Sequence, residues 1–350
     1  MPHDLEGFDA VIERLTHDAS LYFGAAAVSI RPGRPEDRPY SRLLRADVDA
    51  GATSFGIFVK ILKTPGPTKV ERTRQRLRDD FAATRQVHDA LKDDSLAGAV
   101  SPVAVFPDHL ALVTREVPGS NLLRLIERAA SFRARDSQRS LLVEALSNVG
   151  RWLRVFQGIP HIASGGPVLI SLDDLTAYID HRLERLVAAP RARFSLRDRG
   201  AVLDHIANLR KCVDATELQD VPMHSDLAPA NIMVSGNRIV VIDFAMVSRG
   251  GRYHDLARLF AQMDLLKRKP YLRSGFIDAL QRGLLRGYRP DLEASHPLFK
   301  LHLLLHTVNH FATLSLKPDA FPTSFYNWWV RSHHRRWLQQ AATGAGIPVN

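Results

Sequence analysis

The sequence predicts an α+β fold with two lobes, a small antiparallel sheet followed by a mainly helical region. The chain has 350 residues, which suits two lobes better than one small core. Strand-like segments precede and follow a single helical segment between residues 21 and 116, as in a small sheet that carries one helix. Helical periodicity dominates from residue 119 onward. We therefore expect an N-terminal helical extension (1–20), an N-terminal lobe (21–116) and a helical C-terminal lobe (117–350).

The N-terminal lobe is predicted element by element. Phe8, Val11, Ile12 and Leu15 have helical spacing, which predicts the leading helix. The next segments predict a strand (LYFGAAAVSI), a loop (RPGRPEDRPYSR), an alternating strand (SRLLRADVDA) and an apolar strand (FGIFVKIL). A helix over about 71–93 and two strands joined by a Pro-Asp-His turn complete the lobe.

The C-terminal lobe is predicted from a series of amphipathic segments. These are LLRLIERAASF, QRSLLVEALSNVGRWLRVFQ, LDDLTAYIDHRLERLV and RDRGAVLDHIANLRKCV, with further helices from 253 to 340. The exception is 221–248, which is typical of loop, strand, turn and strand. An extended piece near Arg115–Gly119 links the lobes.

Composition narrows the class of protein. Hydrophobic residues make up 45% and charged residues 24%, as in ordinary globular chains, and no apolar run approaches the roughly 18 residues of a membrane span. The start, MPHDLEGFDA, is not typical of a signal peptide. Cys212 is the single cysteine, which excludes an internal disulfide and a thiolate zinc site and favours the reducing cytoplasm.

The chain is basic, with a net charge of +10 and a pI of about 10.0. Such charge favours anionic partners such as phosphates, nucleic acid or an acidic membrane, unless the arginines are merely scattered over solvated faces. We expect no nucleic-acid partner, because no zinc-knuckle, helix-turn-helix or RRM signature is present and the basic residues follow no single stripe. A polycationic substrate is disfavoured by repulsion.

The segment MHSDLAPANIMV, followed by SGNR and IVVIDFA, carries the candidate chemistry. Ser235-Gly236-Asn237-Arg238 separates two short apolar runs and predicts a hairpin. Such a hairpin brings Asn231, before the first strand, close to Asp243, at the end of the second. Amide and carboxylate oxygens are hard ligands suited to Mg²⁺ that carries phosphate, and Asp226 on the upstream loop can face a hydroxyl acceptor. The alternative is that His-Ser-Asp caps a turn and Asp243 closes a strand.

HSDLAPANIMV followed by VIDFA resembles the catalytic segment of the protein-kinase-like superfamily, most closely the aminoglycoside phosphotransferase and choline kinase family. The resemblance spans about residues 25 to 315, with its specific part in 223–260. It implies a bilobal protein-kinase-like fold, ATP and Mg²⁺ as cofactors, and phosphoryl transfer to a hydroxyl of a small molecule.

The resemblance also implies roles for individual residues. Asp226 matches the catalytic aspartate, and His224 matches the histidine that steadies the loop. Asn231 and Asp243 match the metal ligands. Lys60, which ends FGIFVK, matches the lysine that holds the nucleotide phosphates; the alternative is a strand-edge lysine whose amine reaches solvent.

Two further positions complete the match or depart from it. Asp255, in YHDLARL, resembles the aspartate that supports the catalytic loop, and it also suits the start of a helix. The partner of the strand lysine, a glutamate in the family, corresponds here to Asp80, with Asp79 as the alternative and Glu71 too far upstream. The shorter side chain of Asp80 requires a closer helix or a bridging water.

Other motifs also depart from the family pattern. Ser225 replaces the glycine of the family's His-Gly-Asp. Ala245, and not a glycine, follows Phe244. No glycine-rich phosphate loop is present, so Ser41 and nearby amides are the candidates to contact phosphate. The resemblance places the adenine-binding link at Arg115, Glu116 and Val117.

The acceptor is expected to be small. Only MVSRGGRYH separates Ala245 from Asp255, and no Ala-Pro-Glu signature follows, which disfavours a peptide substrate. A sugar, an amino alcohol, an antibiotic or an envelope glycan fits the resemblance, and the charge favours a neutral or anionic sugar. The alternative is a catalytically inactive nucleotide-binding scaffold of the same fold. The sequence leaves the oligomeric state and the choice between ATP and GTP open.

Two features of the helical lobe remain. His302, His306 and His310 are spaced four apart, which allows a metal site, although core or pocket-lining histidines are commoner. The segment FYNWWVRSHHRRWLQQ predicts a C-terminal helix that packs its rings on the lobe. Alternatively, it contacts an anionic glycan, a lipid headgroup or the membrane surface.

Overall fold

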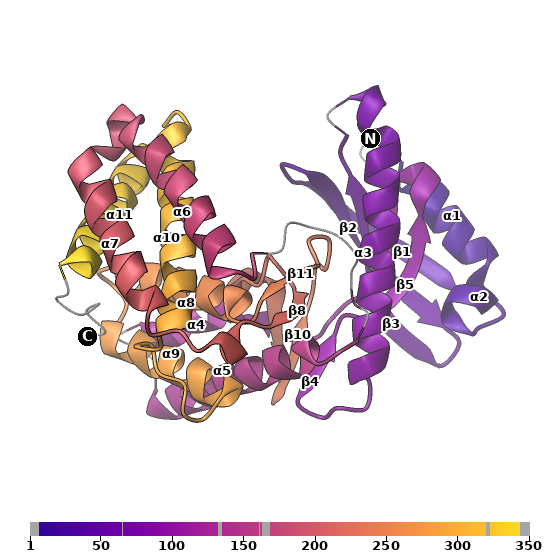
Figure 1. Cartoon of the computed structure of the whole chain (residues 1–350). Helices are drawn as coiled ribbons and strands as arrows, with labels where there is room; N and C mark the ends of the chain where they lie inside the picture. Colours follow the sequence, from indigo (N-terminus) through magenta and orange to yellow (C-terminus); the bar gives the residue numbers. More distant parts are fainter. Residues whose placement is uncertain are drawn as a thin grey trace. The chain divides into compact units, whose positions relative to one another are not determined.

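The computed structural model describes residues 7–64, 66–131, 135–160, 162, 169–319 and 323–343 (Figure 1). The chain divides into two compact units. Unit 1 comprises Met1–Ser120, Ile159–Ala163 and Asn231–Val247, and unit 2 comprises Asn121–Gly158, Ser164–Ala230 and Ser248–Asn350. The first border lies close to the expected link between lobes. The finer boundaries at residues 20 and 116 stay predictions.

Unit 1 is built on a five-stranded antiparallel sheet in the order β1-β2-β3-β6-β5. One long helix, α3, follows the third strand, as the sequence predicts (Figure 1). The strands are β1 (Ser29–Asp37), β2 (Ser41–Ala50), β3 (Thr53–Leu62), β5 (Pro102–Phe106) and β6 (Ala111–Arg115), and the helix is α3 (Val70–Leu91).

The leading helix α1 (Asp9–His17) belongs to the same core as this sheet. Phe8, Val11 and Leu15 are fully buried, and they pack with strand residues such as Leu44 and Val59. Burial of one such large side chain stabilises the fold by about 1.5–3 kcal/mol. The predicted helical spacing is therefore correct, and its apolar face supports the sheet. Residues 1–6 of the expected helix lie outside the described residues.

Two predicted segments of unit 1 are wrong. Residues 21–23 continue a helix, α2 (Ala19–Phe23), which ends at Gly24 in the left-handed conformation, so the expected strand begins only at Ser29. The expected loop RPGRPEDRPYSR is instead mostly strand β1, with a register shift between Pro32 and Pro35. Proline is compatible with this position because β1 is an edge strand and need not donate ladder hydrogen bonds on both sides.

A second, smaller sheet of unit 1 contains the predicted hairpin. β9 (Ile232–Ser235) and β10 (Arg238–Val241) pair antiparallel, with Gly236 at φ +61° in the turn. β4 (Ala97–Ala99), which periodicity does not reveal, pairs in parallel with β10. The chain passes from unit 1 to unit 2 at β7 (Ser120–Asn121).

Unit 2 is mainly helical, as predicted. Its one pair of strands in the described part is β8 (Asp220–Met223) with β11 (Ser248–Gly251). α5 and α9 approach each other so closely that a Cβ on Gly287 would lie 1.9 Å from the carbonyl oxygen of Ser147. Only glycine fits at this position. The helices are α4 (Leu122–Ala130), α5 (Asp136–Gln157), α6 (Leu172–Val187), α7 (Leu196–Arg210), α8 (His254–Leu266), α9 (Ser274–Tyr288), α10 (Pro297–Leu316) and α11 (Ser324–Ala342).

Within the described ranges, none of the helices combines the length and apolar character needed to cross a bilayer.

Candidate active site

Unit 1 brings together two of the predicted residues, Lys60 and Asp243. Lys60 lies on β3, opposite Leu112 of β6, and its Nζ donates to Asp243 Oδ1 at 2.9 Å. Their side chains are 24% and 38% exposed, so the pair is reachable from solvent. Asp243 directly follows the hairpin and has φ +66°, a conformation that costs a non-glycine residue on the order of 1–2 kcal/mol. A residue with a strained backbone that also forms a solvent-reachable charged pair is typical of a functional site.

Asn231 is held beside Asp243 by the hairpin. Its carbonyl oxygen accepts a hydrogen bond from the amide of Ile242 at 3.0 Å, and the next residue, Ile232, pairs with Val241. The predicted convergence of the two positions is therefore confirmed at the level of the backbone. Their roles as ligands stay a prediction.

Asp80 lies on α3, and its side chain is buried, with 3% of its surface exposed. Burial is the main cause that raises the pKa of its carboxyl to about 6; the charge of Lys60 opposes this rise, and the charge of Asp243 adds to it. Its hydrogen-bond donor is Thr84 Oγ1, at 3.3 Å, whereas the Lys60 ammonium contacts Asp243. Asp80 therefore acts on Lys60 through space and not as a direct ion pair, in agreement with its short side chain.

This burial predicts a stability effect that depends on pH. The folded protein binds more protons than the unfolded chain between pH 3.8 and about 6, so the free energy of unfolding falls as pH rises through this window. A difference of about two pKa units corresponds to no more than about 3 kcal/mol. Asp80→Asn keeps the acceptor for Thr84 and removes the buried charge. We expect this variant to be more stable than the wild type by about 1–3 kcal/mol at pH 8 and equally stable near pH 4.

Thermal unfolding from pH 4 to pH 8 measures this effect. Asp79→Asn is the matched control, because the neighbouring Asp79 is exposed and bonded to Gln75 at 2.9 Å. A gain in Tm that does not change with pH, or that is equal in both variants, would contradict the assignment of a raised pKa to Asp80.

In unit 2, the loop after β8 is anchored by Asp255. This residue is fully buried in the first turn of α8, and its carboxylate accepts hydrogen bonds from the amides of His224 at 2.6 Å and Ser225 at 2.9 Å. Burial alone would raise the pKa of Asp255, but contacts with His254 and His224 lower it. Ser225 has φ +61°, a conformation that glycine adopts more readily than other residues. Both interpretations of Asp255, loop support and helix start, are therefore correct.

Asp226 forms an ion pair with Arg258, which the sequence interpretation missed. Arg258 lies on α8, and its Nη2 donates to Asp226 Oδ1. The two side chains are 41% and 30% exposed, so this pair also reaches solvent. Arg258 stands three residues after Asp255, which places both on one face of the helix. That spacing was the signal available in the sequence. Asp226 and the pair of Lys60 with Asp243 belong to different units, so their meeting stays a prediction.

Part of the backbone of the expected adenine-binding link is hydrogen-bonded to other residues of unit 1. The amides of Arg115 and Glu116 donate to the carbonyls of Ser101 at 2.9 Å and Gly56 at 2.8 Å. The Glu116 carboxylate also accepts hydrogen bonds from Arg45 at 3.0 Å. These two amides are therefore used inside the protein.

Ser41 begins β2 and is buried, with 7% of its surface exposed. Its carbonyl oxygen accepts from the amide of Arg38 at 2.9 Å, which closes the short turn between β1 and β2. Its contact with phosphate stays a prediction.

The three histidines of α10 are packed inside unit 2. His306 Nε2 lies 2.8 Å from the carbonyl of His254, and His310 Nδ1 lies 2.9 Å from His334 Nε2. Burial lowers the pKa of His302 to about 3, so its ring is neutral at pH 7. Within the described ranges, no group of three His, Cys, Asp or Glu side chains is placed to hold a metal. The core interpretation is therefore correct.

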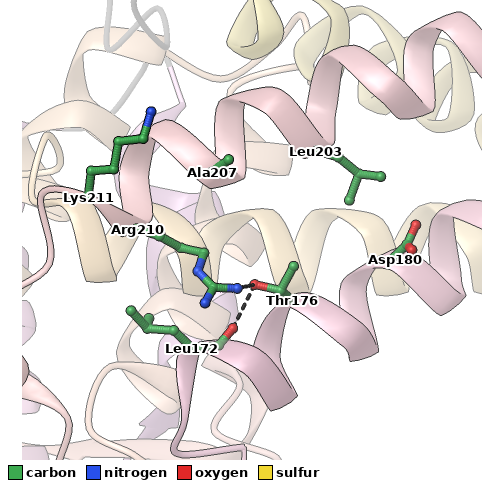
Figure 2. A pocket seen from close by; sticks show the side chains of 7 residues that line it. All are labelled: Leu172, Thr176, Asp180, Leu203, Ala207, Arg210 and Lys211. Carbon is green, nitrogen blue, oxygen red and sulfur yellow. Dashed lines mark hydrogen bonds between the residues drawn. The ribbon is translucent and has the colours of Figure 1, made fainter.

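A cavity of about 570 Å³ lies between α6 and α7, lined by none of the predicted residues (Figure 2). Its polar groups are already bonded to the protein. Arg210 donates to Thr176 Oγ1 at 3.0 Å, Thr176 donates to the carbonyl of Leu172 at 2.6 Å, and Asp180 accepts two hydrogen bonds from Arg199. We therefore do not place the active site there.

Comparison with known proteins agrees with this geometry. Solved structures that resemble the chain include a choline kinase from Cryptosporidium parvum Iowa II, with 12% identity, a TM-score of 0.53, and coverage of 97% of this chain and 98% of that one. The ADP-bound aminoglycoside phosphotransferase APH(2'')-Ib has 12% identity, a TM-score of 0.52, and coverage of 97% and 99%. The GDP complex of a mutant aminoglycoside 2'-phosphotransferase-IIIa has 12% identity, a TM-score of 0.56, and coverage of 98% and 100%. The chain thus has a protein-kinase-like fold.

The family follows from the sequence itself. The model of the phosphotransferase enzyme family matches residues 72–298, well over half of the chain. The chain belongs to this family. A search of curated proteins gives no match.

Proposed function

We propose that the protein transfers the γ-phosphate of ATP to a hydroxyl of a small neutral or anionic molecule, with Mg²⁺ as the metal. The observation that carries this proposal is the solvent-reachable pair of Lys60 and Asp243 at 2.9 Å, with Asn231 held beside it. An ammonium, a carboxylate and an amide are the groups that a phosphoryl-transfer site requires. Membership of the phosphotransferase enzyme family supports the same conclusion.

The nucleotide would be held by unit 1. Lys60 would bind the α- and β-phosphates through its ammonium, which donates to Asp243 Oδ1 at 2.9 Å. Because the amides of Arg115 and Glu116 donate within unit 1, the backbone amide that donates to adenine would be that of Val117. Solved relatives with bound ADP and GDP support the use of a purine nucleotide.

The residues present fit Mg²⁺. Asp243 already attracts a cation, the Lys60 ammonium, and Asn231 adds an amide oxygen close by. Mg²⁺ is usually bound by one or two protein oxygens together with substrate phosphates, so a larger protein cluster is not needed. When bound, it would neutralise charge that develops on the transferred phosphoryl group.

Asp226 would orient the acceptor hydroxyl and accept its proton. Its loop would be held in place by Asp255, which accepts from the amides of His224 and Ser225. Arg258 would hold the Asp226 side chain in position. Catalysis by these residues is mainly positioning and charge stabilisation.

Arg258 also supports a choice of acceptor class. By pairing with Asp226, Arg258 offsets the negative charge that would otherwise attract a cationic acceptor. We therefore favour a neutral or anionic sugar over an aminoglycoside or choline.

A transfer assay with three matched hexoses tests this function. Glucosamine, glucose and glucuronate differ in charge, and each is offered with ATP or GTP, beside choline and kanamycin. We expect transfer to glucose or glucuronate and little to glucosamine. Arg258→Met should lower the ratio of kcat/KM for glucuronate to that for glucosamine by about tenfold. This factor corresponds to the free energy of one charge-assisted hydrogen bond.

Arg249→Met is the control for this assay. Arg249 also pairs with an aspartate, Asp220, at 3.0 Å, but on the strand pair β8–β11. An unchanged ratio in Arg258→Met, or the same change in both variants, would remove the argument for acceptor charge. Transfer to choline or kanamycin alone would point to a cationic acceptor.

The second candidate is a catalytically inactive nucleotide-binding scaffold. For either function we propose a cytoplasmic location. The scaffold is favoured by one observation, the missing direct pair between Lys60 and Asp80. Nucleotide binding without transfer to any acceptor would support it.

A further inference from the structure

The first turns of α11 expose large aromatic side chains. Phe325 is 74% exposed, Trp328 51% and Tyr326 44%. The rings contact one another along the helix: Phe325 and Trp328 have centroids 5.7 Å apart, and Tyr326 and Trp329 have centroids 6.2 Å apart. Exposing so many rings in one place is unusual unless another surface covers them.

The rest of α11 is an ordinary packed helix. Val330 and Leu338 are fully buried, and Trp337 is 9% exposed. The predicted packing of the C-terminal helix is therefore correct for its second half only. Since successive residues turn by 100°, Phe325, Trp328 and Trp329 share one face with the later residues Arg335 and Arg336.

Neighbouring elements of unit 2 extend this surface. Leu196, at the start of α7, is 70% exposed, and Leu316, at the end of α10, is 38% exposed. The α7 start is tied to α11 by a hydrogen bond from Gln339 Nε2 to Asp198 Oδ1 at 2.9 Å. The end of α10 is tied to it through Asp319, which accepts from Asn327 Nδ2 at 3.3 Å.

The same surface is basic. Six cations lie on these segments: Arg191, Arg193, Arg197, Lys317, Arg335 and Arg336. The acidic residues Asp198 and Asp319 are already bonded: Asp198 to Ser195 and Gln339, and Asp319 to Arg331 through two contacts of 2.8 Å. Asp319 is offset by Arg331, so six cations face the single remaining carboxylate of Asp198, and the surface keeps a net positive charge. We call this surface, made of the exposed face of α11, residues 191–197 and the α10 end, the aromatic-basic end.

We propose that the aromatic-basic end binds the surface of an anionic lipid bilayer. Trp, Tyr and Phe rings place an apolar body among lipid chains near the headgroups, and exposed leucines add to the inserted area. Each basic residue near an anionic bilayer contributes about 1 kcal/mol, which is lost at high salt. The combination of rings, leucines and an excess of cations is what this ligand requires.

Two other partners fit the surface less well. A second copy of the chain would bring two sets of six cations together, which opposes association. Single-stranded nucleic acid stacks on aromatic rings inside a basic groove, and it gains little from exposed leucines such as Leu196. Both remain outcomes that the experiment can detect.

Co-sedimentation of the full chain with vesicles tests the proposal. We expect binding to vesicles of phosphatidylcholine with phosphatidylglycerol, weak binding to phosphatidylcholine alone, and loss of binding at 1 M salt. The double variant Phe325→Gln with Trp328→Gln should weaken binding by at least tenfold, and so should Arg335→Gln with Arg336→Gln. Point variants are used because removing α11 would uncover the buried Val330 and Leu338.

Two exposed apolar residues provide matched controls. Tyr40, 81% exposed in the turn before β2, and Leu141, 67% exposed on α5, lie on other surfaces. Tyr40→Gln and Leu141→Gln should bind vesicles like the wild type. Equal binding by all variants would overturn the proposal. A stable dimer in light scattering that dissociates in the α11 variants would also overturn it. Tighter binding to a single-stranded oligonucleotide than to vesicles would do the same.

Discussion

Replacing Asp226 by asparagine is expected to lower phosphate transfer by about 10²–10⁴-fold. The amide keeps the size of the side chain but cannot accept the proton of the acceptor, and Arg258 loses its ionic partner. Nucleotide affinity should stay within about threefold of the wild type, because Lys60 and Asp243 are unchanged. Steady-state transfer and calorimetric titration with ATP, each with Mg²⁺ and with EDTA, measure the two effects.

Asp220→Asn is the matched control for this experiment. Asp220 has a side-chain exposure of 40%, against 41% for Asp226, and it also pairs with an arginine, Arg249. We expect its transfer rate to equal that of the wild type. Loss of activity in both variants would indicate a general effect of breaking an ion pair. Equal background release of phosphate by the wild type and Asp226→Asn would favour the scaffold.

The largest loss of stability is expected for Asp255→Ala. The change leaves the buried amides of His224 and Ser225 without their acceptor, and each unsatisfied group costs about 1–3 kcal/mol. It also releases Ser225 from its strained conformation at φ +61°. We expect the free energy of unfolding to fall by about 3–5 kcal/mol, as for other buried charges that lose a partner. Urea unfolding measures the change.

Asp136→Ala separates loop support from the effect of the helix dipole. Asp136 also lies in the first turn of a helix, α5, but its side chain is 95% exposed and pairs with Arg139 in the same helix. Its removal should cost about 0.3–1 kcal/mol. If Asp255→Ala costs no more than this, the anchoring of the catalytic loop by Asp255 is refuted.

The candidate site was predictable where its signals are local. A short turn between two apolar runs suffices to pair Ile232 with Val241, and this pairing brings Asn231 next to Ile242 and Asp243. The helical spacing of Phe8, Val11 and Leu15 likewise identifies a buried face. In both cases the information lies within a few residues, so periodicity is enough.

Predictions failed where distant segments decide the structure. The three-residue strand β4 exists because β10, about 140 residues later, lies beside it in parallel. The prolines of β1 signal a loop, yet the strand forms because it lies at the sheet edge and needs fewer donors. Residues 21–23 resemble a strand in composition but complete the helix that ends at Gly24.

The amino-acid sequence by itself determined the family, most of the strands and helices, and the residues expected to carry the chemistry, because these depend on residue type and short spacing. The tertiary structure alone decided which charges meet. It paired Lys60 with Asp243, left Asp80 buried without a direct cation, and set Arg258 against Asp226. Ion pairs and burial depend on side chains far apart in the chain, whose distances no local pattern contains.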